Sequence, residues 1–373
     1  MKVSAPPTGA ATAQPQLLEA ARGGDEDAFA RLVEPHRAEL HAHCYRMLGS
    51  VHDAEDALQN ALLRAWKGIA RFEDRSSLRS WMYKIATNTS LDVIGKRPKR
   101  VLPVDYGPAA DPHDGPGEPI TESVWIEPYA DERLEVTDGE PGPEASFEQR
   151  EGVELAFVAA LQHLPATQRA ALILREVLGF SAKETAEALD TTVASVNSAL
   201  QRARATIDEK LPEESQQETL RQLGDEKTTE LVERYMRAWE ENDVDTVVAM
   251  LAEDATFTMP PLGTWFGGRD EIEIFLRGSP LSGTWNWKPI RVRANGQEAL
   301  AFYQWDEDEG AYKRFALNVL TFRGEQIADV TAFITTDAPS DDREVILRMP
   351  DHPYDEAALD AAFGQFGLPE RLD

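Results

Sequence analysis

Cysteine and long apolar runs are the two features that this sequence most clearly lacks. Cys44 is the only cysteine among 373 residues, so no disulfide can form within the chain, and we expect a reducing, cytoplasmic setting. No run of 18 apolar residues is present, which argues against a membrane-spanning helix. Residues 1–15 lack the apolar core of a signal peptide and are typical of a disordered leader.

Basic residues are also scarce. The chain has 38 Lys and Arg against 66 Asp and Glu, a net charge of −28. This balance argues against free DNA binding, since affinity for phosphate rests on Lys and Arg. The acid is concentrated, however, in residues 101–150 (−11) and 212–373 (−18), while residues 16–100 carry +2 and 151–211 carry −2. A protein that binds DNA only as part of a complex with a larger partner can have this distribution of charge.

The spacing of apolar residues divides the chain into segments. Helical periodicity predicts all-α blocks over 16–98 and 145–211, separated by an acidic, proline-rich linker over 99–144. A short linker over 212–225 leads to an α+β domain over 226–336, and residues 337–373 look like a tail with one short helix near 356–363. Strands of an antiparallel meander are expected at 255–259, 290–293, 299–305, 315–322 and 327–334.

Residues 179–207 have the pattern of a helix-turn-helix. Ser181 and Glu184 are spaced as a capping box, and Thr191 or Thr192 can cap the second helix. Val193, Val196 and Leu200 are expected to face inward; the opposite face suits base edges and phosphates. From periodicity alone, an ordinary helical hairpin with a polar face is an equally good interpretation. The candidate DNA-reading residues are Thr192, Ser195, Asn197, Ser198, Gln201, Arg202 and Arg204.

The run LQHLPATQRAALILREVLGFSAKETAEALDTTVASVNSALQRARATI, residues 161–207, resembles domain 4 of the extracytoplasmic-function (ECF) branch of the sigma-70 family. The resemblance implies a three-helix core whose last helix reads the promoter −35 element. Asp190 stands where the family often has Gly, and Asp tolerates the left-handed conformation. Asn197 and Ala199 stand where Lys and Arg are common, which predicts weaker intrinsic DNA affinity.

Residues 26–98 resemble domain 2 of the same family, through DAFARLVEPHRAELHAHCYRMLGS, DAEDALQNALLRAWKGIARF and DRSSLRSWMYKIATNTSLDVIGKRPKR. Two matches in this order are more specific than either alone. The resemblance implies binding to core RNA polymerase, at the β′ clamp helices and the β flap. Asp53 is also the expected N-cap of its helix, and the alternative for these acids is a favourable interaction with the helix dipole. The expected polymerase contacts are Asp53, Glu55, Asp56, Gln59 and Asn60.

The third of these runs corresponds to the reader of the promoter −10 element, which holds opened single-stranded DNA. Aromatic rings and cations together suit that task, and Ser and Asn side chains suit a flipped base. Packing against Ile85 is an equally good interpretation of Trp81. The acidic linker would thread through the polymerase, or act as a plain tether. The expected −10 contacts are Arg75, Ser76, Ser77, Arg79, Trp81, Tyr83, Lys84 and Asn88, with the basic cluster 96–100 behind them.

Residues 226–336 resemble the cone of SnoaL and ketosteroid isomerase, whose relatives are enzymes or binding modules. Asp254 is the best candidate base, with Trp265, Tyr303 and Trp305 as candidate pocket lining. We favour a plain turn or capping role for Asp254, and expect no catalytic residue, cofactor or metal. The resemblance to a sigma-G-like subgroup implies that the acidic cone regulates the factor, in the role of a separate anti-sigma protein, with an unknown small ligand as a further candidate partner.

The expected fold class is therefore multidomain: two all-α sigma domains, a domain 2 helical bundle and a domain 4 helix-turn-helix, followed by an α+β cone. Three functions stay open from the sequence. A sigma factor with a regulatory cone needs promoter DNA and core polymerase. A helix-turn-helix activator with a ligand-sensing cone predicts DNA binding without polymerase. An isomerase or cyclase predicts turnover that is lost in Asp254→Asn.

Overall fold

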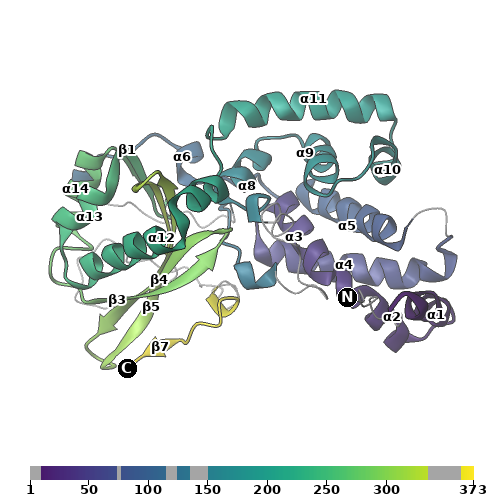
Figure 1. Cartoon of the computed structure of the whole chain (residues 1–373), viewed down its shortest axis with the longest axis horizontal. Helices are drawn as coiled ribbons and strands as arrows, with labels where there is room; N and C mark the ends of the chain where they lie inside the picture. The colour runs from purple at the N-terminus through teal and green to yellow at the C-terminus, as the bar shows by residue number, and fades with distance from the viewer. Residues whose placement is uncertain (1–9, 74–76, 115–123, 135–149, 335–362) are drawn as a thin grey trace, which may run out of the picture.

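The computed structural model describes residues 10–73, 77–114, 124–134, 150–334 and 363–373. In Figure 1 the helical part lies on the right and the β-sheet part on the left, with helix α11 along the top edge. Within the described residues, no helix is long and apolar enough to cross a membrane.

The first helical bundle is built around α3, whose residues Cys44, Tyr45 and Met47 are fully buried. Its first helix begins at Ala10, inside the stretch expected to be a leader. Ser50, and not Asp53 as expected, caps α4, because the Ser50 side chain accepts a hydrogen bond from the Asp53 amide. The helices are α1 (Ala10–Arg22), α2 (Glu26–Val33), α3 (Arg37–Leu48), α4 (Val51–Gly68) and α5 (Leu78–Ile94).

Part of the expected linker over 99–144 is packed rather than extended in solvent. It contains the short helix α6 (Pro103–Tyr106), and Val101 forms an isolated bridge with Trp125. Ile126 and Tyr129 are fully buried. Apolar residues among the prolines explain this packing, because their burial offsets the entropic cost of ordering the segment.

The second helical block contains the expected helix-turn-helix. The capping box of Ser181 and Glu184 is confirmed, as is Thr192 as the cap of the second helix. Asp190 has the left-handed conformation, with φ 48°. Val196 is buried as expected, but the prediction for Val193 is wrong, since 42% of it is exposed in the first turn. The elements are α8 (Leu155–Gln162), α9 (Ala166–Leu172), the π-helix η5 (Ile173–Val177), α10 (Ala182–Ala188) and α11 (Val193–Lys210).

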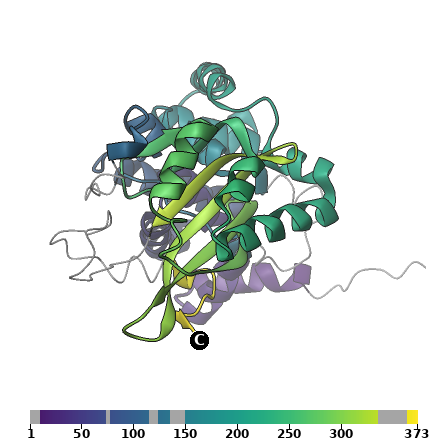
Figure 2. The ribbon, with the colours of Figure 1, turned by 90° about the vertical axis from the view of Figure 1, so that its left-hand side faces the viewer.

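The C-terminal domain is an α+β cone, and Figure 2 looks onto it with helices flanking a twisted sheet. Its first helix begins at Gln216, inside the expected second linker. The sheet order is β2-β1-β6-β5-β4-β3. β3 to β6 form the expected antiparallel meander, but β1 pairs with β6 in parallel, so the sheet is mixed. The helices are α12 (Gln216–Glu240), α13 (Val244–Met250) and α14 (Arg269–Gly278). The strands are β1 (Leu251–Thr258), β2 (Trp265–Gly267), β3 (Trp287–Ala294), β4 (Gln297–Asp306), β5 (Ala311–Arg323) and β6 (Gln326–Ile334).

The sheet has an apolar face on each side. Successive residues of a strand point to opposite faces. Leu300 and Phe302 of β4 therefore enter the interior of the cone, while Ala301 and Tyr303 join the core that also contains both helical blocks. Part of the expected tail packs on this outer face through Phe363 and Phe366, and β7 (Arg371–Leu372) then pairs with the edge of β5. The short helix expected near 356–363 lies almost wholly outside the described residues. The cone is thus packed onto the helical domains through a shared core.

Candidate nucleic-acid interface

The polar face of α11 is open to solvent. Figure 1 shows this helix at the edge of the molecule, joined to the rest along one side. Arg204 is ion-paired with Glu176, and Thr192 lies 3.0 Å from the Ser195 hydroxyl. All seven side chains expected to read the −35 element are exposed: Thr192, Ser195, Asn197, Ser198, Gln201, Arg202 and Arg204. This arrangement provides hydrogen-bonding groups and two guanidinium groups on one accessible helix.

The aromatic and cationic side chains of α5 are already engaged within the molecule. Tyr83 is fully buried, and its hydroxyl donates to Glu39 over 3.1 Å. Burial raises the pKa of Tyr83, so the phenol is neutral. The Arg79 guanidinium lies over the rings of Tyr83 and Phe180, 4.9 and 5.0 Å from their centres. In this conformation neither side chain is free to stack on a base.

The first helix of the helix-turn-helix, α10, lies against α5. Lys84 donates to the Glu187 carbonyl over 2.8 Å and to the Asp190 carboxylate over 2.5 Å. The Ser80 hydroxyl donates to Glu184 over 3.4 Å. The rings of Tyr83 and Phe180 meet edge to face at 5.3 Å. We call these contacts the α5–α10 interface; in it, the domain expected to read the −35 element covers part of the expected −10 reader.

Other expected −10 residues are less buried than Tyr83. Ser77 is exposed and caps α5 by accepting from the Ser80 amide, while Asn88 is half-buried. The half-buried Trp81 ring packs 5.0 Å from the ring of Phe72. Arg75 and Ser76 lie outside the described residues.

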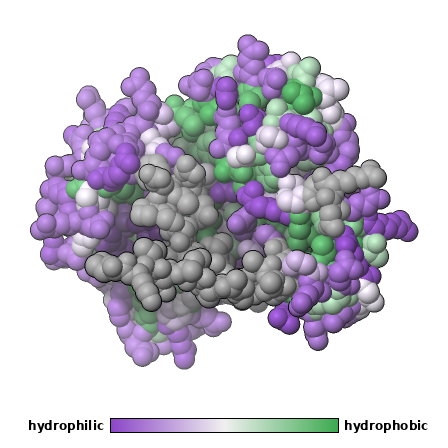
Figure 3. Space-filling model, turned by 45° about the vertical axis from the view of Figure 1, so that its right-hand side comes forward, coloured by the Kyte–Doolittle hydropathy of each residue, from purple (hydrophilic) through white to green (hydrophobic). Residues whose placement is uncertain are grey.

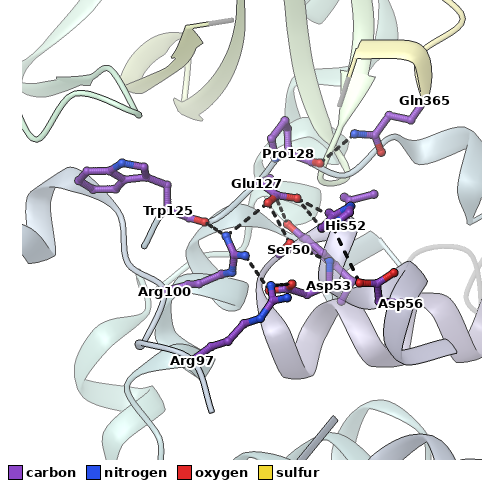
Figure 4. Close-up of polar contacts among 12 residues, drawn as sticks. Ser50, His52, Asp53, Asp56, Arg97, Arg100, Trp125, Glu127, Pro128 and Gln365 are labelled. Carbon is purple, nitrogen blue, oxygen red and sulfur yellow. Dashed lines mark hydrogen bonds and ion pairs between the residues drawn. The ribbon is translucent and has the colours of Figure 1, made fainter. Parts of the chain in front are cut away.

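Asp53, expected to touch the polymerase, is buried beneath two arginines of the basic cluster 96–100. Its carboxylate pairs with Arg97 and, at 2.6 Å, with Arg100 (Figure 4). Arg100 also donates to the Trp125 carbonyl over 2.7 Å and lies 3.3 Å from Glu127. Sequence reasoning missed this network because its members are far apart in the chain, with Arg100 47 residues from Asp53 and 27 residues from Glu127. Asp53 is not available to a partner in this conformation.

Glu127 supplies a second cap to α4. Its carboxylate accepts from the Ser50 hydroxyl over 2.9 Å and from the Val51 amide over 2.8 Å. A carboxylate at this end of a helix satisfies free amides and interacts favourably with the helix dipole. The expected linker therefore anchors the start of the helix that is expected to contact the polymerase.

The outer face of α4 presents a stripe of exposed side chains. Asp56, Gln59 and Asn60 belong to it, whereas Glu55 is half-buried, 3.5 Å from His41. Leu63, 56% exposed, extends the stripe by one turn and was not singled out from the sequence, although its spacing from Gln59 and Asn60 gave the signal. Figure 3, in which the right-hand side of Figure 1 comes forward, shows a mainly hydrophilic surface with apolar patches. The large exposed apolar side chains of the described residues are Leu63, Val104, Tyr106, Val193 and Ile274.

The turn between β3 and β4, Asn295–Gly296, is buried between the cone and the helical domains. Asn295 has φ 57° and is fully buried. Its side-chain amide donates to the Tyr45 hydroxyl and to the Val153 carbonyl, both over 2.8 Å. Its side-chain oxygen accepts from the Tyr129 amide over 2.9 Å. We call this turn the junction turn, because it contacts the first bundle, the packed segment and the second helical block at once.

Further bonds tie the same turn to charged and polar neighbours. The Gly296 amide donates to Asp131 over 2.7 Å, and Arg293 pairs with that carboxylate. Gln217 at the start of α12 donates to the Gly296 carbonyl. The sequence shows Asn-Gly as a turn, but nothing in it indicates that the turn is buried.

The candidate base Asp254 is on the surface of the cone. It is 70% exposed and paired with Arg323 at 2.9 Å, and that hydrogen bond lowers the pKa of its carboxyl group. A solvated, paired carboxylate of this kind is a poor general base, because proton abstraction needs a raised pKa and a pocket. No group of His, Cys, Asp and Glu able to hold a metal occurs among the described residues.

The three aromatic residues expected to line a pocket make other contacts. The Trp265 indole donates to the Gly107 carbonyl over 2.8 Å, and the Tyr303 hydroxyl donates to the Pro369 carbonyl over 2.7 Å. Trp305 packs edge to face on Tyr312 at 5.1 Å. None of these three residues, nor Asp254, lines the apolar cavity of the cone, whose walls include Trp239, Trp287 and Asn318.

Comparisons with known proteins agree with this arrangement. The chain matches Sigma-70 region 2 over residues 32–100, Sigma-70 region 4 over 154–207 and a SnoaL-like domain over 232–330. The ECF RNA polymerase sigma factor SigG of Mycobacterium tuberculosis (strain ATCC 25618 / H37Rv) is 41% identical over 319 residues, 84% of this chain and 82% of the relative. SigW of Bacillus subtilis (strain 168) is 41% identical over 80 residues, 21% of this chain and 43% of the relative.

Among solved structures, the crystal structure of the Mycobacterium tuberculosis ECF sigma factor SigJ is similar, with a TM-score of 0.52. The match has 22% sequence identity and covers 81% of this chain and 94% of the other. At that identity the likeness concerns the fold.

Proposed function

Because this chain belongs to the ECF RNA polymerase sigma factors and carries a fused SnoaL-like domain, we propose that its reading helices meet the promoter in two stages that the cone controls. ECF sigma factors bind core RNA polymerase and promoter DNA. In the first stage, α11 meets the −35 element through its exposed polar face. In the second, α5 receives the opened −10 strand once α10 has moved away. The observation that carries this proposal is the α5–α10 interface.

The stripe on α4 is the proposed docking surface for the β′ clamp helices. Asp56, Gln59 and Asn60 supply polar contacts, and Leu63 supplies an exposed apolar anchor of the kind that dominates many interfaces. Glu55 lies at the edge of this stripe. The second helical block is the proposed partner of the β flap. We place this activity in the cytoplasm, with the polymerase.

The cone is the proposed regulator of the transition. The junction turn bonds to Tyr45, Tyr129 and Val153, so it fixes the two helical blocks and the packed segment relative to one another. As long as the junction turn keeps these buried contacts, α10 stays packed against α5. The cone thereby acts as a built-in inhibitor rather than as an enzyme, in keeping with the surface position of Asp254.

Transcription reconstituted from the chain and core polymerase tests the proposal. We expect promoter-specific initiation from a genomic promoter library only when both are present, and more of it with Asn295→Ala, which loosens the junction turn. The absence of any initiated promoter with both chains would refute the proposal. Leu63→Glu should weaken binding to core polymerase by about tenfold or more, since it places a charge in the contact. Ile274→Glu, at an exposed apolar residue of the cone, is the matched control and should leave binding unchanged.

A further inference from the structure

A basic pocket lies where the first helical bundle meets the second helical block. The bundle and the basic cluster 96–100 supply one wall, and the turn from α8 into α9 supplies the other. Its free volume is about 390 Å³, and small-molecule sites typically have about 300–1,000 Å³. A molecule in this pocket would therefore contact both helical blocks at once.

The lining of the pocket carries an excess of positive charge. One carboxylate, that of Asp53, is present together with four cations: Arg97, Lys99, Arg100 and Arg169. Arg97 and Arg100 both pair with this carboxylate, as Figure 4 shows, so it is not available to the other two cations. A surplus of one sign in a concave site attracts ions of the opposite sign.

Arg169 is the cation of this pocket that has no counter-charge. Its side chain is almost fully buried, and it donates only to uncharged oxygens: the carbonyls of Met47 and Leu164 and both oxygens of Gln162. Its Nε atom has no hydrogen-bond partner among the described residues. Burial lowers the pKa of Arg169 to about 10, so the guanidinium is still charged at neutral pH. A buried charge without a counter-charge is costly, and an anion in the pocket would offset that cost.

Lys99 adds an exposed cation to the pocket. Its ammonium group donates to the Nδ1 atom of His163 over 2.9 Å, and the Nε2 atom of that ring lies 3.0 Å from Asp105. Asp105 also lies 3.8 Å from Lys210. Burial lowers the pKa of Lys99, Asp105 opposes this effect, and the charges of Arg169 and Lys210 add to it. One carboxylate thus serves several groups, and positive charge is left over.

The burial of Arg169 favours a terminal phosphate group over a phosphate inside a nucleic-acid strand. A strand would have to enter the pocket with the sugars on both sides of its phosphate, whereas a terminal phosphate extends from one end of a small molecule. Phosphate is the anion that clustered Arg and Lys side chains commonly bind in proteins. The apolar part of the lining, which includes Val93, Ile94 and Leu164, suits the remainder of such a molecule.

We propose that this pocket binds the terminal phosphates of a small phosphorylated molecule, of the class of a nucleoside diphosphate, between the two helical blocks. Lys99 contacts the phosphates directly, and Arg169 attracts them through its charge from the opposite wall. This inference does not depend on the role of the chain in transcription, because the binding can be measured on the purified chain alone.

Calorimetric titration of the full chain with ADP, adenosine and the dinucleotide TpT tests the site. ADP should bind saturably, with a Kd of about 1 mM or less. Adenosine lacks phosphate, and the only phosphate of TpT is internal, so both should bind at least about tenfold more weakly. Saturable binding of ADP with this order supports the proposal. No saturable binding of ADP, or binding of adenosine or TpT as tight as that of ADP, overturns it.

Charge variants locate the binding in the pocket. Lys99→Glu reverses the charge of an exposed residue and should weaken ADP by at least about tenfold. Lys67→Glu, at an exposed residue in the last turn of α4, makes the same change in net charge outside the pocket and should leave the affinity unchanged. Affinity for ADP that is unchanged in Lys99→Glu, or lowered equally in both variants, would exclude this pocket.

Arg169→Met tests the buried charge. It removes the cation at similar size and should abolish the binding of ADP. Binding of ADP as tight as in the unmodified chain would contradict the role of this arginine. If Arg169→Met does not fold, as thermal unfolding would show, Lys99→Glu still decides the question.

Discussion

Helices α11 and α5 both read promoter DNA in the proposed mechanism, yet they differ in what their reading faces touch. The seven side chains of α11 expected to read DNA are all exposed, and among these seven only Arg204 has an ion-pair partner within the described residues. On α5, Tyr83 is buried, Arg79 lies between two rings and Lys84 is bonded to α10. One reader is preformed, and the other becomes accessible only after a domain movement.

The forces at the α5–α10 interface indicate how that movement is controlled. The exposed Lys84–Asp190 pair contributes about 0–1 kcal/mol, because water and salt screen it. The edge-to-face contact of Tyr83 with Phe180 contributes about 0.5–1.5 kcal/mol beyond burial. These values are modest, so the interface itself is easily opened. In the proposed mechanism the junction turn, with its buried hydrogen bonds, is the stronger restraint on the position of α10.

The largest effect is expected from Asn295→Ala. The change leaves the Tyr129 amide and the Val153 carbonyl without partners and puts alanine at φ 57°, so it should cost about 3 kcal/mol or more. Affinity for a single-stranded −10 oligonucleotide should rise at least about tenfold, while affinity for a −35 duplex stays constant. Fluorescence anisotropy measures both.

Asn242→Ala is the matched control for that variant. Asn242 has a similar left-handed φ of 54° but lies within the cone, where it donates to the Trp285 carbonyl. It should lower stability without changing either DNA affinity. An equal gain in affinity for the −10 strand in both variants would show that a general loss of stability, and not the loss of the junction turn's contacts, exposes α5.

A smaller effect is expected from pH, through Glu154. Burial raises the pKa of this carboxyl group to about 7, although it accepts hydrogen bonds from the Gln216 and Gln217 amides at the start of α12. The folded chain then binds more protons than the unfolded chain between the ordinary pKa, near 4.5, and about 7. Stability should therefore fall as pH rises through this window, by about 2–3 kcal/mol.

Glu154→Gln checks the origin of that pH dependence. Gln216 and Gln217 donate to different oxygens of Glu154, and the amide NH2 group of glutamine cannot accept, so one of these two hydrogen bonds is lost and stability falls at every pH. Glutamine does not titrate, so the slope of unfolding free energy between pH 5 and 7 should flatten. Affinity for the −10 oligonucleotide should rise with pH in the unmodified chain and should be flatter in the variant. If both chains show the same slope, another group is responsible.

On the exposed face of α11, Asn197→Lys should increase affinity for the −35 duplex several-fold, because the lysine adds one contact with a phosphate. The slope of log affinity against log salt should steepen by about 1. Asn286→Lys, at an exposed residue of the cone, adds the same charge elsewhere. A salt slope that steepens equally in both variants would mean that net charge, and not the position on α11, sets the affinity.

The smallest effect is expected from Asp190→Asn. Asparagine tolerates the left-handed conformation at this position, so the change removes only the charge that pairs with Lys84. Affinity for the −10 strand should rise by less than about fivefold, and the gain should vanish at 1 M salt. A gain that persists at high salt would contradict the assignment to an ion pair.

How well the sequence predicted each feature depended on the range of the interactions involved. Capping at Ser181 and Thr192, the polar face of α11 and the strands β3 to β6 follow from residues within a few positions of one another. The burial of Asp53 depends on Arg100, and that of Asn295 on Tyr45, 250 residues away. The predicted pocket included Asp254 because catalysis needs a base, whereas the observed cavity has no charged residue among its described lining and does not include Asp254.

The covalent fusion of the cone has a kinetic consequence. Because the junction turn and the groups it binds belong to one polypeptide, the proposed inhibitor has a fixed effective concentration, whatever the amount of protein in the cell. Release of the cone from the helical domains and its return are then first-order events. Neither dilution nor overproduction of the chain changes the balance between the two states. A separately synthesised inhibitor would impose a threshold set by stoichiometry, whereas here the output of transcription should rise in proportion to the amount of the chain.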